Sequence, residues 1–235
     1  MRPMLAFDTS TPCARVAVLS AEGDCLAAAE KVAARHSSNL LRLCDEVLRA
    51  TGATVNDLAA IACGAGPGSF TGLRVGLAVA KGLALADGIP LLLGSSLDAL
   101  AVDLTGTNGE GLVLPCIDAG KGQVYGRLYR AAGGTPAPIG TDELVLSPED
   151  LCRLVQGQAA GAAVVAGGNG VDRYQEIFRA QLGAEAVRFQ VAGPSALAVG
   201  RLARARLARG ERDDLETSVP RYGRPPDITK PKAAL

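Results

Sequence analysis

The stretch GAGPGSFTGLRVGLAVAKGLALA, at residues 64–86, constrains the fold of this chain more than any other segment. It opens with a turn rich in glycine and proline and continues as a long, nearly uncharged helical pattern. Ser69 or Thr71 can cap the start of a helix through a side-chain oxygen, and Gly88 followed by Pro90 is a typical stop signal. The pattern therefore predicts one long apolar helix over residues 69–86.

One face of this predicted helix carries almost no side chains. Gly72, Gly76, Ala80 and Ala84 recur every four residues, with leucines on both flanks. An interior glycine costs about 1 kcal/mol relative to alanine, so close contact with another backbone should offset that cost. Two interpretations remain open, because the bare face could pack inside the chain's own core or against a helix of another subunit.

The composition favours a globular protein that does not bind nucleic acid by bulk charge. A chain of 235 residues, 48% of them hydrophobic, is long enough for one large domain or two small lobes. The 24 basic and 24 acidic side chains cancel, whereas binding by bulk charge requires an excess of basic residues. Arg201, Arg204 and Arg209 lie in one predicted late helix and remain candidates for a local contact with an anion.

The six cysteines are scattered and include no CxxC pair, which is typical of buried, reduced thiols in a cytosolic protein. We find no signal-peptide pattern at the start of the sequence, and the apolar runs are too short to span a bilayer. The sequence therefore predicts a cytoplasmic protein that does not enter a membrane.

Two segments of the chain share a pattern of strand, aspartate, turn and strand. MLAFDTSTPCARVAVL at residues 4–19 and LVLPCIDAGKGQVYGRLY at residues 112–129 place Asp8 and Asp118 at corresponding positions. We interpret the pair as a duplicated α/β protein whose boundary falls in the polar segment 105–111; two unrelated hairpins are the alternative. The predicted lobes are residues 1–106 and 107–235.

Hydrophobic periodicity and turn residues predict the other elements. Further strands are expected at residues 25–31, 58–63, 89–93, 123–129, 163–167 and 186–191. Helices are expected at residues 38–50, 95–103, 171–182 and 194–209, and one more begins at Ser147. Residues 105–111, 131–141 and the proline-rich tail beyond 211 are expected to be irregular.

A few polar residues could bind phosphate. Asp8 and Asp118 at strand ends could hold a metal–phosphate or orient a water, or could simply form turns. The GAGPGSFTG loop could present backbone N–H groups to an anion at a helix N-terminus, or it could be a rigid turn. It lacks the lysine of a Walker A motif and the glycine spacing of a dinucleotide fingerprint. The candidate nucleotide or phosphate residues are Asp8, Thr9, Ser10, Gly68, Ser69 and Asp118.

His36 is the only histidine. One imidazole cannot form a His-based zinc pair, and no serine–histidine–aspartate or cysteine–histidine set suggests itself around it. A role at a helix start or an interface fits His36 better than catalysis. The residues by themselves therefore predict neither a catalytic residue nor a metal site.

Several motifs, taken together, resemble the TsaB (YeaZ) family, the partner subunit in bacterial tRNA threonylcarbamoyladenosine synthesis. The resemblance covers most of the first 130 residues, and the tail adds PRYGR at 220–224. Its motifs are LAFDTST at 5–11, RHSSNLL at 35–41, GPGSFTGLRVG at 66–76, AKGLA at 80–84, SSLDALA at 95–101 and IDAGKGQVY at 117–125. One departure is Ala119-Gly120-Lys121, where many relatives carry an arginine after the alanine.

This resemblance implies an α/β fold of the actin/sugar-kinase-like (ASKHA) type, duplicated, with two lobes and a reduced second lobe. It implies a subunit without catalytic residues that binds and activates a TsaD-like subunit through helices of the first lobe. The implied helices are 38–50 and 69–86, so the bare glycine face would serve this contact. The predicted interface residues are Leu40, Leu41, Cys44, Leu48, Gly72, Leu73, Gly76, Leu77 and Ala80.

The same resemblance implies a complex that recruits a TsaE-like ATPase and transfers threonylcarbamoyl to adenosine 37 of tRNA. In it this chain would meet tRNA only indirectly and hold no firmly bound cofactor, with ATP or ADP and Mg²⁺ at the complex junction. Alone, the chain could form a homodimer. The alternatives are an ASKHA-type ATPase or phosphotransferase that uses Asp8 and Asp118, and a metallopeptidase-like protein.

Overall fold

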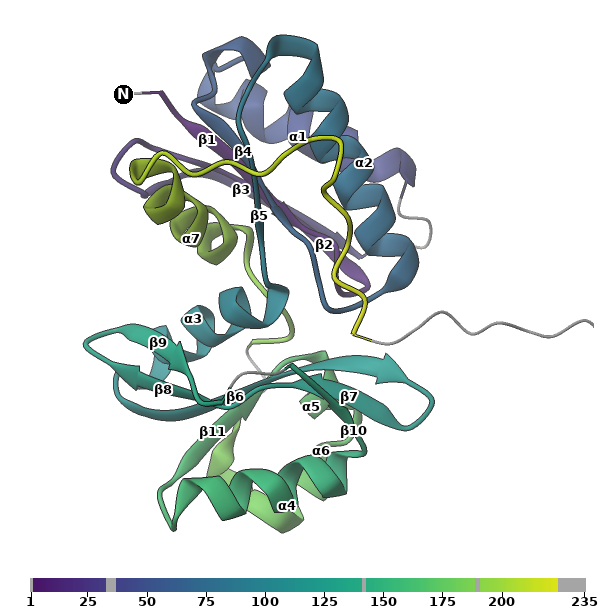
Figure 1. Ribbon diagram of the computed structural model, residues 1–235, viewed down its shortest axis with the longest axis vertical. Coiled ribbons are helices and arrows are strands. Elements are labelled where there is room, and N and C mark those ends of the chain that lie inside the picture. Colours follow the sequence, from purple (N-terminus) through teal and green to yellow (C-terminus); the bar gives the residue numbers. More distant parts are fainter. Residues whose placement is uncertain (1, 33–36, 141–142, 189–190, 224–235) are drawn as a thin grey trace, which may run out of the picture.

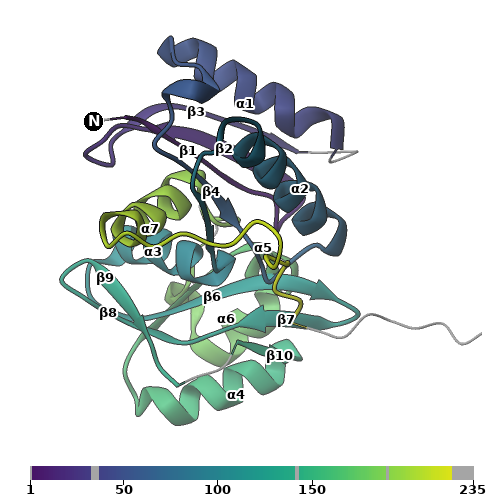
Figure 2. The ribbon, with the colours of Figure 1, turned by 45° about the horizontal axis from the view of Figure 1, so that its top comes forward.

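The computed structural model describes residues 2–32, 37–140, 143–188 and 191–223. Two β-sheets alternate with layers of helices, so the molecule is built as helix, sheet, helix, sheet and helix (Figure 1). The view turned by 45° separates the layers more clearly (Figure 2). His36 lies outside the described residues.

The first sheet contains five strands in the order β3-β2-β1-β4-β5. Its central strand β1 pairs antiparallel with β2 and parallel with β4. The strands are β1 (Met4–Asp8), β2 (Cys13–Leu19), β3 (Cys25–Val32), β4 (Ala60–Gly64) and β5 (Leu91–Gly94).

Strand residues of this sheet point alternately to two buried layers, as period-2 strands require. Leu5 and Phe7 face the layer formed by α1 (Ser37–Thr51) and α2 (Phe70–Asp87). Met4 and Ala6 face the opposite layer, which contains α7 (Ala196–Ala208). Because both faces are covered, β1 is buried along its whole length.

The second sheet repeats the arrangement of the first. Its path is β10-β7-β6-β11-β12, with β6 antiparallel to β7 and parallel to β11. A hairpin of β8 and β9 adds to β6. The strands are β6 (Gly111–Gly120), β7 (Gln123–Gly126), β8 (Tyr129–Ala132), β9 (Thr135–Pro138), β10 (Leu144–Leu146), β11 (Val164–Gly167) and β12 (Val187–Arg188).

Helices cover both faces of the second sheet as well. α3 (Ser96–Asn108) packs on the face that looks toward the first sheet. α4 (Pro148–Ala159) and α6 (Gln175–Leu182) cover the other face, and α5 (Asn169–Arg173) follows β11. The equivalent positions of β1 and β6 confirm the predicted duplication.

Most predicted elements are confirmed within a few residues, and four predictions are wrong. Residues 105–108 continue α3 instead of forming a loop, and residues 131–141 include the end of β8 and the whole of β9. The strand predicted at 123–129 is interrupted between β7 and β8. The helix predicted at 171–182 breaks at Tyr174 into α5 and α6.

The predicted lobe boundary is also wrong, because the chain crosses back to the first lobe. The helix α7 packs on the first sheet, where Gly200 lies against Leu19 and Ala6. Beyond α7, Asp213 N–H donates to the carbonyl of Leu91 in β5 (2.8 Å). Residues 1–106 and 107–235 are therefore not the two structural units.

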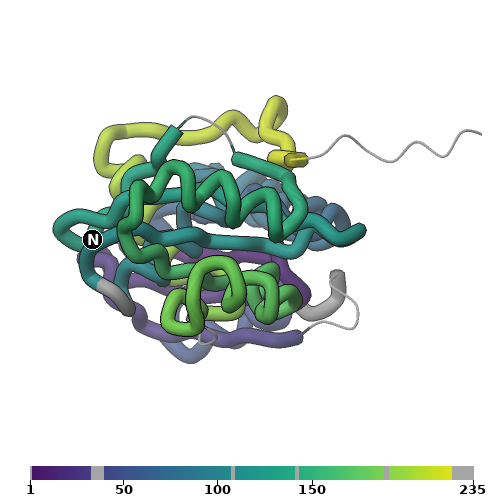
Figure 3. The backbone as a smooth tube through the Cα atoms, turned by 90° about the horizontal axis from the view of Figure 1, so that it is seen from below, coloured from purple at the N-terminus to yellow at the C-terminus, as the bar shows by residue number. Residues whose placement is uncertain are grey.

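We call residues 209–223 the C-terminal strap. It runs in an extended path from α7 across the edge of the first sheet to the N-terminal end of α2, and lies along one side of the molecule (Figure 3). At its start, Arg206 of α7 donates to Asp213 (3.0 Å) and Glu211 (2.8 Å). At its end, Arg221 N–H donates to the carbonyl of Ala65 (2.7 Å).

Candidate functional site

The Asp8 carboxylate, the strongest candidate for chemistry, is enclosed by the chain's own groups. One oxygen accepts hydrogen bonds from Ser10 N–H (2.7 Å) and Ser10 Oγ (2.5 Å), and the other accepts from Ser96 Oγ (2.7 Å). Asp8 is 1% exposed. Burial raises the pKa of Asp8, although the hydrogen bonds and the charge of Arg15 act to lower it. The carboxylate therefore lies out of reach of a ligand in this conformation.

The glycine-rich loop before α2 is likewise occupied by the chain itself. Ser69 N–H donates to the carbonyl of Ser10 (2.7 Å), and Gly72 N–H donates to Ser69 Oγ (3.2 Å), which caps α2 as predicted. A Cβ on Gly68 would lie 2.3 Å from that Ser10 carbonyl, so only glycine permits the contact. The loop is a rigid turn and does not fit an open phosphate cradle, which corrects one interpretation of Gly68 and Ser69.

The remaining phosphate candidates do not complete a site. Thr9 is buried, and its hydroxyl donates to the carbonyl of Gly72 (2.8 Å). Asp118 belongs to the other sheet, where it accepts from Gly120 N–H (3.0 Å) and pairs with Arg173 (3.1 Å). Asp8 and Asp118 thus have separate sets of partners, and the structure shows each of them organising its own turn.

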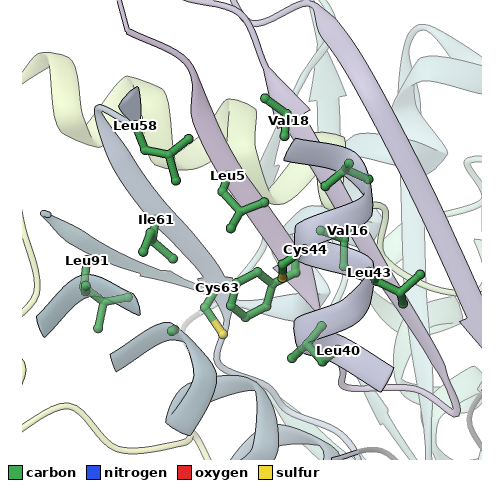
Figure 4. Packing of buried hydrophobic residues seen from close by; sticks show 14 of the residues in the cluster. Leu5, Val16, Val18, Leu40, Leu43, Cys44, Leu58, Ile61, Cys63 and Leu91 are labelled. Atoms are coloured by element: carbon green, nitrogen blue, oxygen red, sulfur yellow. The ribbon is translucent and has the colours of Figure 1, made fainter. Parts of the chain in front are cut away.

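The bare face of α2 packs on the first sheet of its own chain. A Cβ on Gly76 would lie 2.3 Å from Thr9 Oγ1 and 3.6 Å from Cys63 Sγ. Eight of the nine predicted interface residues are buried, and Figure 4 shows Leu40 and Cys44 beside the strands. Because side chains buried in the monomer cannot meet a partner, the prediction is wrong for Leu40, Cys44, Leu48, Gly72, Leu73, Gly76, Leu77 and Ala80.

Only Leu41 of the predicted set is exposed (52%). The solvent side of α2 carries a second series with small residues at the same four-residue spacing. We call its exposed residues Arg74, Ala78, Gly82 and Leu85 the outer face of α2. The sequence held a signal that separates the two series, because Leu73 and Leu77 follow Gly72 and Gly76 and mark the buried side.

An aromatic and cationic cluster lies at the N-terminal end of this outer face. The guanidinium of Arg74 lies 4.0 Å from the ring centre of Phe70, and its Nε donates to the hydroxyl of Tyr222 (3.0 Å). The rings of Phe70 and Tyr222 lie 5.1 Å apart. Sequence analysis missed this cluster because Tyr222 lies 148 positions from Arg74.

The structure also describes possible metal ligands, the cysteines and the apolar character of the helices. The part of the chain that the structure describes contains no group of three or more His, Cys, Asp or Glu residues that could hold a metal ion. Cys44, Cys63, Cys116 and Cys152 are buried free thiols, as predicted, whereas Cys25 is exposed. Over the same described residues, every helix is too short or too polar to cross a membrane.

Comparisons with known proteins agree with the duplicated fold. A family model described as "TsaD: tRNA N6-adenosine threonylcarbamoyltransferase" matches residues 28–214. The tRNA threonylcarbamoyladenosine biosynthesis protein TsaB of Escherichia coli K12 is 35% identical over 164 residues, which make up 70% of each chain.

Solved structures extend the comparison to nearly the whole chain. YeaZ from Pseudomonas aeruginosa has a TM-score of 0.80 and 32% identity, and the match covers 94% of this chain and all of that one. A dehydratase component of Acidaminococcus fermentans shares the fold alone. It is 13% identical, with a TM-score of 0.54, and the match covers 88% of this chain and all of that one. The chain therefore has the actin/sugar-kinase-like (ASKHA) fold and belongs to the TsaB (YeaZ) family.

Proposed function

We propose that this chain takes part in tRNA threonylcarbamoyladenosine biosynthesis as a non-catalytic subunit that binds and activates a TsaD-type catalytic subunit. Membership of the TsaB family supports the pathway, since the E. coli relative is named for it. We place this activity in the cytoplasm, where tRNA is found.

The enclosure of Asp8 is the observation that carries the non-catalytic role. In an ATPase or phosphotransferase, a carboxylate must reach Mg²⁺, phosphate or an attacking water. Here both oxygens of Asp8 accept hydrogen bonds from the chain itself, and the side chain is 1% exposed. This geometry favours a structural role for Asp8 over the ATPase alternative, and we propose that any nucleotide and Mg²⁺ at the complex junction are held mainly by the catalytic subunit.

The outer face of α2, together with exposed residues of α1 such as Leu41, is the surface that we propose for the catalytic subunit. Ala78 and Gly82 let a second helix approach closely, and Leu85 is 73% exposed. Exposed apolar groups that cluster on one side of a protein commonly mark an interface. In the absence of the catalytic subunit, two copies of this chain could pair through the same face.

We propose that tRNA and a TsaE-type ATPase act on this chain only through the complex. The three arginines that were candidates for contact with an anion such as tRNA already stabilise the fold. Arg201 donates to the carbonyl of Gly23 (3.3 Å), Arg204 donates to that of Ala21, and Arg209 pairs with Glu211 (2.6 Å). The net charge of zero gives no general attraction for phosphates either.

Reconstitution with the TsaD-type subunit of the same organism tests this proposal. Size-exclusion chromatography with light scattering should show a stoichiometric complex, and threonylcarbamoyl transfer to tRNA should depend on adding this chain. Hydrolysis of ATP by the purified chain, lost in Asp8→Asn, would instead support the ATPase alternative. No complex together with transfer that is independent of the chain would overturn the proposal.

A further inference from the structure

The cluster of Phe70, Arg74 and Tyr222 holds an arginine in a fixed orientation at the molecular surface. Arg74 lies over the Phe70 ring at 4.0 Å and is 6.0 Å from the centre of the Tyr222 ring. The hydroxyl of Tyr222 accepts the Nε–H of Arg74. Contact with the aromatic rings restrains the guanidinium while its terminal nitrogens can still donate in the plane of the group.

The backbone on both sides of Tyr222 is anchored, so the cluster is ordered before any partner arrives. Arg221 N–H donates to the carbonyl of Ala65 (2.7 Å), and a Cβ on Gly66 would lie 2.7 Å from the Arg221 carbonyl. On the other side, a Cβ on Gly223 would lie 2.6 Å from the ring of Tyr125. A side chain held in this way loses little conformational entropy on binding.

Arg74 contacts aromatic rings, whereas several other arginines of this chain pair with carboxylates. Arg15, Arg49 and Arg153 each have a carboxylate at 3.0 Å or closer. Across residues 2–32, 37–140, 143–188 and 191–223, Arg74 has two aromatic rings and no carboxylate partner. α2 itself carries no acidic residue before Asp87, its last residue.

From this geometry we infer that Arg74 receives a carboxylate of the TsaD-type subunit, an inference that rests on the proposed function. A planar guanidinium can donate two parallel hydrogen bonds to a carboxylate. Arginine and tyrosine are also over-represented among the residues that dominate interface energies. Phe70 and Tyr222 are positioning residues that aim the arginine.

The rest of the outer face indicates what kind of surface surrounds that carboxylate on the TsaD-type subunit. Beyond Arg74, α2 presents the small residues Ala78 and Gly82 and then the exposed Leu85. The complementary surface is therefore an apolar helix with an Asp or Glu at the end that meets the N-terminal half of α2. The acidic group fixes the register of the two helices, because a carboxylate out of register would be buried without a partner.

Binding of purified full-length variants to the TsaD-type subunit, measured by calorimetry, tests the inference. Arg74→Glu should weaken the complex by about 100-fold, and Arg74→Lys by about tenfold because lysine lacks the planar fork. The matched control is Arg153→Glu in α4, also exposed and remote from α2, which should leave the affinity within about twofold of wild type. Unchanged thermal unfolding of Arg74→Glu would show that the variant is folded.

Two further measurements identify the group that binds. Charge reversal of one acidic residue of the TsaD-type subunit should restore binding to Arg74→Glu. Tyr222→Phe should weaken binding when it is the only substitution in the chain. Combined with Arg74→Glu it should have no added effect, as expected for a residue that acts through Arg74. Wild-type affinity in Arg74→Glu would overturn the inference and leave the proposed function standing, whereas failure of wild type to bind would overturn the proposed function. Loss of tRNA binding with intact subunit binding would assign Arg74 to phosphate instead.

Discussion

Gly76 lies so close to Thr9 that a Cβ on the glycine would stand 2.3 Å from the threonine hydroxyl oxygen. That hydroxyl donates to the carbonyl of Gly72, one turn earlier in α2. The small residues of α2 thus let the helix pack directly on the turn that follows β1. This close packing joins the two most distinctive segments of the sequence, LAFDTST and GPGSFTGLRVG, into one rigid unit.

Gly76 and Gly82 lie on opposite sides of α2, so replacing each with alanine should change the free energy of unfolding in opposite directions. Gly76→Ala should lower the free energy of unfolding by roughly 1–3 kcal/mol, because the methyl group overpacks a buried contact. Gly82→Ala, where no atom lies within 4 Å of the added Cβ, should raise it by about 0.5–1 kcal/mol through helix propensity. Urea unfolding of both variants is the measurement, and equal shifts in one direction would contradict the assignment of the buried face.

The raised pKa of Asp8 predicts how stability depends on pH. Because the pKa in the folded state lies above the ordinary value of 3.8, the native state binds the proton more tightly than the unfolded state does. The stability that the proton on Asp8 contributes to the native state is fully present below pH 3.8. It is lost as the pH rises through the folded-state pKa. Wild type should therefore lose stability relative to Asp8→Asn on going from acidic to neutral pH, and a constant difference in urea unfolding would contradict this.

The link between α3 and α7 predicts a costly cap substitution. Ser195 caps α7, and its N–H and hydroxyl both donate to Asp103 of α3 (2.7 Å each). Burial raises the pKa of Asp103, whereas these hydrogen bonds act to lower it. Ser195→Ala should cost about 2 kcal/mol or more, because it removes a cap and leaves Asp103 short of a donor.

Ser147→Ala is the control for that cap. Ser147 caps α4 and bonds the exposed Asp150, so its loss should cost only about 1 kcal/mol. Thermal and urea unfolding of the two variants compare the caps directly. A larger loss in Ser147→Ala would show that the link between α3 and α7 adds little stability.

The start of the C-terminal strap predicts a local change in hydrogen exchange. Asp213 accepts Leu93 N–H (2.7 Å) and Arg206 (3.0 Å), and so secures the free edge of β5. In Asp213→Ala, the amide of Leu93 should exchange about tenfold faster, since one buried hydrogen bond is worth about 1 kcal/mol or more. Arg209→Ala, which breaks an exposed ion pair, should leave that amide unchanged. Equal protection in wild type and Asp213→Ala would contradict this role.

Sequence reasoning recovered the local elements well because they depend on local signals. The cap at Ser69, the helix that begins at Ser147 and the strand β1 were predicted from neighbouring residues alone. The β8–β9 hairpin was missed because Gly133, Gly134, Pro136 and Pro138 are typical of loops.

Long-range relationships could not be predicted in the same way. Nothing local to α7 indicates that it returns to the first sheet, or that Tyr222 reaches Phe70 and Arg74. The four-residue spacing of small residues in α2 likewise does not indicate whether the chain's own sheet or another subunit packs on the bare face. Close packing within the fold and contact with another subunit require the same small residues, so only the tertiary structure separates them.

Threonylcarbamoyl transfer to tRNA by the TsaD-type subunit, measured with variants of this chain, tests the central claim most directly. Gly82 in α2 and Gly157 in α4 are both exposed helical glycines with open space around them, so Gly82→Arg and Gly157→Arg form a matched pair. We predict that Gly82→Arg abolishes the stimulation of transfer, whereas Gly157→Arg and folded Asp8→Asn sustain it at the wild-type level. Full stimulation by Gly82→Arg, or its loss in folded, partner-bound Asp8→Asn, would contradict a non-catalytic subunit that acts through the outer face of α2.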